Sequence, residues 1–257
     1  MRFLIIGDVI GKPGRKLVGE KVKTIKKSHN IDAVIVNGEN AAGGLGITPE
    51  TTEELLGFGI DVVTTGNHVW DKKEILPYID SQFRLLRPLN YPPGVPGNGS
   101  VILKNNQRKW AVLNLSGRVF MSPLDCPFQT LDKELEIIKK ETNIILVDFH
   151  AEATSEKIAF GWYCDGRVSC VVGTHTHVVT ADEKVLPGGT AYITDIGMTG
   201  AHQSVIGIDT KQLLSRFLTQ LPVRYTVAQD HVILNGVIVA VDDQTGKSVF
   251  LTRSGLS

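Results

Sequence analysis

Three short apolar runs, each closed by a glycine and polar residues, constrain the fold of this chain more than any other feature. The runs at residues 2–7, 33–36 and 61–65 lead into Gly7-Asp8, Gly38-Glu39-Asn40 and Gly66-Asn67-His68. Their polar ends lie about 30 residues apart, the length of a strand–helix–strand unit. The sequence therefore predicts consecutive parallel strands whose polar ends meet at the carboxyl edge of one sheet, where open α/β folds bind ligands.

The segments between these runs have helical signals. Residues 12–30 repeat apolar side chains at helical spacing among lysines. Thr48 and Pro49 are typical of a helix N-cap and of the first position inside a helix. Asp71 is predicted to cap a third helix that reaches about Ile79.

The middle of the chain differs, because residues 83–118 are rich in proline and glycine. Two β-like runs, 100–103 and 110–115, flank a turn at residues 105–108 and predict a hairpin that opens a second sheet. Regular alternation then returns with a helix at 131–141, a strand at 143–149 ending at His150, a helix at 153–160 and a strand at 168–173. That last strand leads into Thr174-His175-Thr176-His177, and an extended segment there would point both histidines the same way.

The last third of the chain predicts further elements of both kinds. They are strands at 190–194, 224–227, 232–241 and 248–252, with a helix at 209–221 and a hairpin turn at 242–246. With no long linker between these elements, we expect one domain over residues 1–257.

Composition narrows the classes of function. Lys plus Arg and Asp plus Glu both number 27, so the chain lacks the cationic excess of a protein that coats DNA. The chain has three cysteines, Cys126, Cys164 and Cys170. A small and odd number of cysteines does not fit a disulfide framework, and we interpret them as reduced thiols of a cytoplasmic protein. No run approaches the ~20 apolar residues of a membrane span, so no membrane association is expected.

Five predicted strand ends have side chains of the kinds that bind metals. They are Asp8, Glu39 with Asn40, Asn67 with His68, His150, and His175 with His177. Carboxylate and imidazole ligands together favour transition metals over calcium or magnesium. Two such ions, bridged by Glu39, would activate a water as nucleophile and stabilise a displacement at phosphorus. Iron or manganese are the expected metals, with zinc as an alternative.

Each of these residues also has a structural explanation when taken alone. Asp8 suits a turn, and His150 suits a hydrogen-bonded core position. Residues 7–13 resemble a phosphate loop but have the wrong glycine spacing, so we reject that interpretation. His202 is a weaker candidate for contacting substrate, and surface roles are favoured for Arg118 and Arg167.

In order and in placement at strand ends, these blocks resemble the calcineurin-like metallophosphoesterases. The usual histidine two residues after the first aspartate is Ile10 here, and the second block has Glu39 followed by Asn40. With residues 147–157 and 195–200, these departures are similar to the bacterial YmdB-like branch. That resemblance implies an α/β fold of four layers, an α/β/β/α sandwich with two mixed β-sheets. It also implies a phosphodiesterase with 2′,3′-cyclic nucleotides as a substrate class.

The resemblance also implies roles for single residues. One metal would bind Asp8, Glu39, Asn40 and His177, and the other Glu39, Asn67, His150 and His175. His68 would protonate the leaving oxygen or stabilise the transition state. Ile10 leaves the coordination of the first metal open.

Two other functions compete with a phosphodiesterase at this stage. One is a phosphomonoesterase with the same dinuclear site. The other is a regulatory protein that binds a phosphorylated ligand or RNA and turns over slowly. RNA ends are a second expected substrate, and assembly into a homo-oligomer stays open.

Overall fold

The computed structural model describes residues 1–105 and 107–256, and its first sheet is built around the predicted parallel strands. The neighbours β1 (Arg2–Ile6), β3 (Ala33–Asn37), β4 (Val62–Thr64) and β5 (Leu85–Leu86) all run parallel. On the other side of β1 lies β13 (Val232–Val241), which is antiparallel to it. The sheet is completed by β12 (Met198–Ala201), β2 (Asp8–Val9) and β14 (Ser248–Leu256).

The second sheet is six-stranded and also mixed. Its centre is a parallel set of four strands, β7 (Arg108–Ser116), β8 (Ile145–His150), β9 (Cys170–Thr174) and β11 (Ala191–Ile193). Antiparallel strands β6 (Ser100–Asn105) and β10 (Lys184–Val185) form its two edges. The hairpin predicted between residues 100 and 115 is confirmed, although Asn106 in its turn lies outside the described residues.

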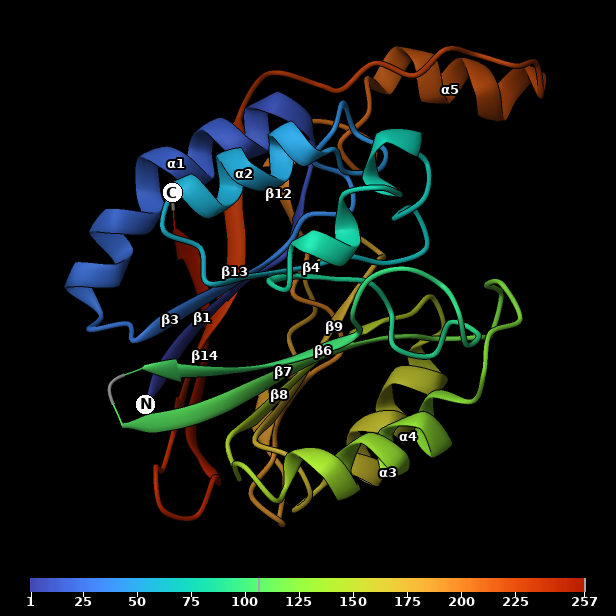
Figure 1. Cartoon of the computed structure of the whole chain (residues 1–257). Coiled ribbons are helices and arrows are strands. Elements are labelled where there is room, and N and C mark those ends of the chain that lie inside the picture. The colour runs from blue at the N-terminus through green and yellow to red at the C-terminus, as the bar shows by residue number, and fades with distance from the viewer. Residues whose placement is uncertain (106, 257) are drawn as a thin grey trace.

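Helices cover the outer face of each sheet, which gives the four predicted layers (Figure 1). The first sheet is covered by α1 (Gly11–Ser28) and α2 (Pro49–Gly57), and the second by α3 (Pro127–Ile138) and α4 (Thr154–Cys164). A further helix, α5 (Thr210–Thr219), projects from the body of the molecule. Among the described residues, no helix has both the length and the apolar character needed to cross a bilayer.

Three apolar clusters hold the layers together. One lies between the first sheet and its helices and includes Val18, Val22 and Ile25 of α1. The central cluster packs the two sheets face to face, with Phe3 against Trp110. The third lies between the second sheet and its helices. Burying both faces of each sheet explains why the strands are near-continuous apolar runs.

Helix α2 begins as its sequence predicts. The side chain of Thr48 accepts a hydrogen bond from the Thr51 backbone N–H, and the Thr51 hydroxyl accepts one from the Thr48 N–H. Pro49 occupies the first turn, where its missing N–H costs nothing.

Two predicted elements are wrong. Residues 71–79 form no α-helix but two short 3₁₀ turns, η1 (Lys73–Ile75) and η2 (Ile79–Ser81). Pro77 lies inside that segment, and proline both removes a backbone donor and disfavours a helical residue before it. Residues 224–227 form no strand and make only the bridge between Ile208 and Val227.

Candidate metal centre

The carboxyl ends of strands from both sheets meet at one edge, and the predicted site residues lie there. The first sheet positions Asp8 at the start of β2, Glu39 and Asn40 after β3, and Asn67 and His68 after β4. The second sheet ends β8 at His150 and leads from β9 into His175 and His177. All the residues singled out at strand ends are therefore brought to the same edge.

Two groups of ligand atoms form at this edge, and they share one residue. The first group is Asp8, Glu39 and His177, and the second is Glu39, His150 and His175. Within each group the ligand atoms lie within 4.8 Å of one another. Glu39 belongs to both groups, as a carboxylate that bridges two ions would.

The second group is tightly gathered around the Nε2 atom of His150. That atom lies 3.1 Å from Glu39 Oε1, 3.0 Å from Asn67 Oδ1 and 3.0 Å from His175 Nδ1. Two imidazole nitrogens, a carboxylate and an amide oxygen therefore converge on one small volume.

The first group is more open. His177 Nε2 lies 3.8 Å from Asp8 Oδ1. The amide nitrogen of Asn40 donates a 3.2 Å hydrogen bond to the carbonyl of Gly44, which leaves its oxygen free. Ile10 is buried and packs against Gly200 and Gly207, so it is not a ligand. The buried oxygen of Asn40 is the candidate for that position instead.

Buried oxygens without partners indicate that this edge suits cations. Within the described part of the chain, the buried atoms Asp8 Oδ1, Glu39 Oε1 and Asn40 Oδ1 accept no hydrogen bond. An unsatisfied buried acceptor costs about 1–3 kcal/mol, and three of them lie together here. Divalent ions would satisfy all three, and the mixture of carboxylate, amide and imidazole donors fits transition metals.

Each histidine directs its other ring nitrogen to a protein acceptor. His150 Nδ1 lies 2.9 Å from the hydroxyl of Thr174, which itself donates to Asp148. His175 Nε2 lies 3.1 Å from Glu152, and His177 Nδ1 lies 3.0 Å from the carbonyl of Ile206. Such contacts fix the orientation and tautomer of metal-binding imidazoles.

These contacts behind the histidines were not predicted from the sequence. Glu152 and Thr174 are ordinary loop and strand-end residues by type, and only their distances to the rings assign them a function.

The electrostatics of the metal-free site follow from burial and close charges. Burial raises the pKa of Asp8 to about 6, against the opposing effects of His177 and His150. Burial alone would also raise the pKa of Glu39, but the charge of His150, whose Nε2 lies 3.1 Å from Glu39 Oε1, lowers it to about 2. Burial lowers the pKa of His150, and Glu39 and Asp8 outweigh that effect and raise it to about 9. Without metal, the site therefore holds a His150–Glu39 ion pair.

His68 lies beside the ligand groups rather than within them. Its backbone N–H donates to Glu39 Oε2 at 3.3 Å, and its Nδ1 lies 2.8 Å from Asp71 Oδ2. Asp71 thus has a different role from the helix cap that the sequence predicted.

The predicted geometry of the two later histidines is wrong. His175 and His177 do not continue an extended strand, because their φ angles are 96° and 65°. The chain turns through left-handed conformations directly after Thr174. Both rings reach the site because of this turn and not because of strand alternation.

The weaker candidates are not members of the ligand groups. Arg167 forms an ion pair with Asp132 of α3, as expected for a surface role. His202 is exposed, and its backbone pairs with that of His231. The backbone N–H of Arg118 is held by buried Glu156.

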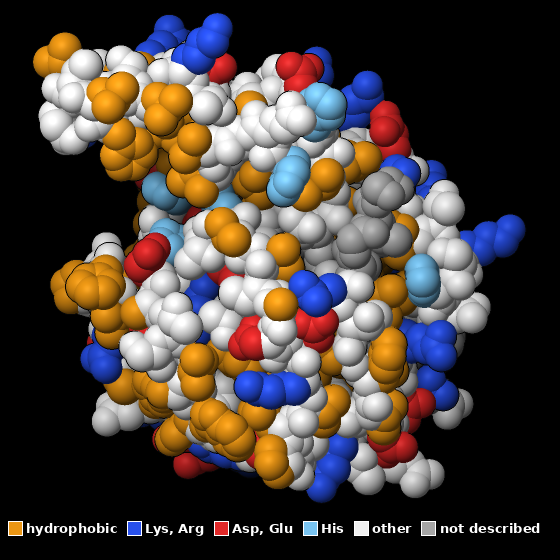
Figure 2. Space-filling view, turned by 180° about the vertical axis from the view of Figure 1, so that it is seen from behind, with side chains coloured by type: hydrophobic (Ala, Val, Ile, Leu, Met, Phe, Trp, Pro, Cys, Tyr) orange, Lys and Arg blue, Asp and Glu red, His pale blue; other side chains and the backbone are white. Residues whose placement is uncertain are grey.

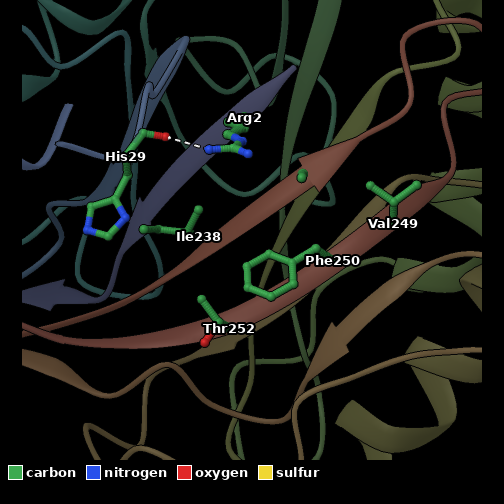
Figure 3. Close-up of a pocket in the computed structure, with 7 residues that line it drawn as sticks. Arg2, His29, Ile238, Val249, Phe250 and Thr252 are labelled. Atoms are coloured by element: carbon green, nitrogen blue, oxygen red, sulfur yellow. Dashed lines mark hydrogen bonds between the residues drawn. The ribbon is translucent and has the colours of Figure 1, made fainter. Parts of the chain in front are cut away.

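Figure 2 shows histidine side chains gathered in a hollow beneath the overhang formed by α5. A different groove, of about 480 Å³, lies at the amino-terminal end of β1, away from the ligand groups (Figure 3). It is lined mainly by apolar side chains from β13 and β14, and Arg2 donates there to the carbonyl of His29. His29 is therefore not part of the candidate metal centre.

Comparison with known proteins decides the family. The model of the YmdB-like proteins matches residues 4–253. The chain belongs to the YmdB-like family. A 2′,3′-cyclic-nucleotide 2′-phosphodiesterase of Bacillus subtilis is 52% identical to this YmdB-like protein, over 98% of this chain and 96% of that protein.

Solved structures agree with this assignment. A crystal structure from Mycoplasma pneumoniae, described as a novel phosphatase, superposes with a TM-score of 0.93 at 36% identity. The match covers 99% of this chain and 92% of the other. A 5′-nucleotidase of Staphylococcus aureus shares the fold alone, with a TM-score of 0.55 at 16% identity, and 52% of its chain is covered. The YmdB-like protein thus shares the fold of these structures, and its two ligand groups are of a kind that could hold metal ions.

Proposed function

We propose that this protein is a phosphodiesterase that hydrolyses phosphate diesters, with 2′,3′-cyclic nucleotides as the substrate class. The observation that supports this most is the pair of ligand groups that share buried Glu39. The name of the 52% identical Bacillus subtilis relative supports the substrate class.

The ligand assignment is part of the proposal. Asp8, Glu39, Asn40 and His177 would hold one ion, and Glu39, Asn67, His150 and His175 the other. Iron or manganese are the proposed metals, with zinc as an alternative. Such a pair, when bound, supplies positive charge to the phosphoryl oxygens and activates water for attack.

The residues of the chain provide the rest of the chemistry. Glu39, His150, His175 and His177 would hold the ions at one edge, where a phosphoryl group could bind to them. The half-buried His68 lies beside them, and its Nδ1 is 2.8 Å from Asp71 Oδ2. We assign it the role of stabilising or protonating the oxygen that leaves phosphorus, as a positioned general acid does.

An assay of paired substrates tests the proposal. We expect manganese-loaded protein to hydrolyse 2′,3′-cyclic AMP and bis-p-nitrophenyl phosphate well, and p-nitrophenyl phosphate poorly. Faster turnover of p-nitrophenyl phosphate would favour the phosphomonoesterase alternative, which the description of the Mycoplasma structure keeps open. Absence of hydrolysis of all three, with both ions bound, would contradict the proposal.

We propose a cytoplasmic location from the state of the cysteines alone. Cys126, Cys164 and Cys170 are free thiols, which agrees with a reducing cytoplasm. RNA that ends in a 2′,3′-cyclic phosphate presents the same diester as the small substrate. Hydrolysis of such an oligonucleotide at a rate comparable to the cyclic mononucleotide would extend the substrate class to RNA ends.

A further inference from the structure

Behind the two later histidines lies a fully buried ion pair that the proposed chemistry does not use. Lys157 of α4 and Asp195, which follows β11, are each 1% exposed, and their charged atoms lie 2.7 Å apart. Replacing such a pair by apolar residues is often neutral or stabilising. Its presence in this core therefore needs a reason other than fold stability.

The Lys157–Asp195 pair forms hydrogen bonds with the turn that carries His175 and His177. Lys157 Nζ donates to the carbonyl of Thr174 at 2.7 Å. Asp195 Oδ2 accepts from both the backbone N–H and the hydroxyl of Thr176, at 3.2 and 2.8 Å. The other oxygen of Asp195 accepts from the N–H of Gly197. The contacts thus alternate, with residues 174 and 176 held and residues 175 and 177 free to face the site.

The turn needs such contacts because its backbone is strained. Positive φ angles at non-glycine residues such as these two histidines are unfavourable and persist only where the surroundings enforce them. Gly173 allows these hydrogen bonds to form, because a Cβ at this position would lie 1.8 Å from the carbonyl oxygen of Thr194 and 3.3 Å from Lys157 Cδ. The strands β9 and β11 are thereby close enough for one ion pair to span both of their ends.

We propose that Lys157 and Asp195 are positioning residues, which hold the strained turn so that His175 and His177 face the two separate ion positions. This inference rests on the proposed metal centre. Because one histidine belongs to each ligand group, loss of the contacts made by Lys157 and Asp195 should lower the affinity for both ions. Loss of a single histidine, by contrast, should lower the affinity for one of the two ions.

The test uses the double variant Lys157→Met with Asp195→Asn, which removes both charges and leaves no unpaired one. Protein is stripped of metal and titrated with Mn²⁺ by calorimetry, and its metal-free melting temperature is recorded. We expect affinity at both sites to fall about 10–100-fold, as for other changes behind metal ligands. Asp132→Asn, which breaks the partly exposed pair with Arg167, is the matched control and should bind like wild type.

A milder variant tests the same proposal if the double variant does not fold. Thr176→Val keeps the shape of the side chain and removes only its hydroxyl bond to Asp195. We expect about tenfold weaker binding at both sites with little change in the metal-free melting temperature. A double variant, or Thr176→Val, that binds two ions with wild-type affinity overturns the positioning role alone. Wild-type protein that binds no Mn²⁺ overturns the proposed function as well.

Discussion

Among the residues that the structure describes, three buried oxygen atoms of the candidate metal centre accept no hydrogen bond, and one of them belongs to Asp8. We predict that Asp8→Ala loses one of the two ions and nearly all hydrolysis. Metal content by elemental analysis and turnover of 2′,3′-cyclic AMP measure the two effects. If a biological output of this protein survived that loss of hydrolysis, ligand binding rather than catalysis would be its function.

His68 should behave differently, because its hydrogen bond to the ligand groups comes from its backbone N–H. We predict that His68→Gln keeps both ions and lowers kcat by about 10²–10⁴-fold, the usual contribution of a general acid. His29→Gln is the control, because that exposed histidine ends α1 far from the site. Loss of metal from His68→Gln would instead make His68 a ligand.

Protons compete with metal for these residues. The pKa values of His150 and Asp8 are raised to about 9 and about 6, so both hold protons more tightly in the metal-free folded protein than in the unfolded chain. The stability gained from the His150 proton is complete below about pH 6.5 and is lost as the pH rises through 9. Metal needs the neutral ring, so Mn²⁺ affinity should rise with pH over this window.

Calorimetry can count the protons directly. At pH 7 we expect Mn²⁺ binding to release about one proton, seen as a dependence of the heat on the ionisation enthalpy of the buffer. At pH 9.5 that release should be largely gone. Equal heats in all buffers at pH 7 would show that His150 is already neutral before metal arrives.

At the scale of elements, strand ends hold the backbone very close to the ligands. A Cβ on Gly66, just after β4, would lie 2.2 Å from His150 Cδ2 and 2.3 Å from Glu39 Oε2. Gly66→Ala should therefore displace the shared ligand and abolish uptake of both ions. Gly57→Ala, at the end of α2 where a Cβ meets nothing, should leave metal content unchanged and stabilise the fold by about 0.4–1 kcal/mol.

Metal content and urea unfolding of the two alanine variants are the measurements. A Gly66→Ala variant with two ions at wild-type affinity would show that the strand end can shift without cost.

The elements predicted best from the sequence are those whose local pattern of apolar residues matches their burial in the folded protein. Parallel strands β1, β3 and β4 are apolar because both faces of the sheet are covered, and their polar ends mark the ligand edge. Short strands such as β12 have no such signal, since Met198–Ala201 is defined by its partners β2 and β13. The turn after β9 was mispredicted because its φ angles depend on Asp195 and Lys157, which lie far away in the sequence.

At the scale of the whole molecule, the ligand groups join the two sheets. Glu39 comes from the first sheet and His150 from the second, and their side-chain atoms lie 3.1 Å apart. Ions held there would cross-link the layers, so metal should stabilise the complete fold. At 100 times the dissociation constant, one bound ion adds about 2.7 kcal/mol, which raises Tm by roughly 5–10 °C in a chain of this size.

Scanning calorimetry with and without Mn²⁺ measures this shift. Asp8→Ala should show a smaller one, because it retains one group only. A wild-type Tm that is indifferent to Mn²⁺ would mean that the ions do not connect the sheets.

The pairing of β1 with β13 has a consequence for the newly made chain. Arg2 precedes Ala240, its partner in the sheet, by 238 residues of the chain. Contacts between such distant residues slow folding. Asp8 lies on β2, beside β12, so its neighbours are also translated late. Because the two ligand groups also need His175 and His177, the nascent polypeptide completes neither group before these residues are translated, and loading with metal follows that point.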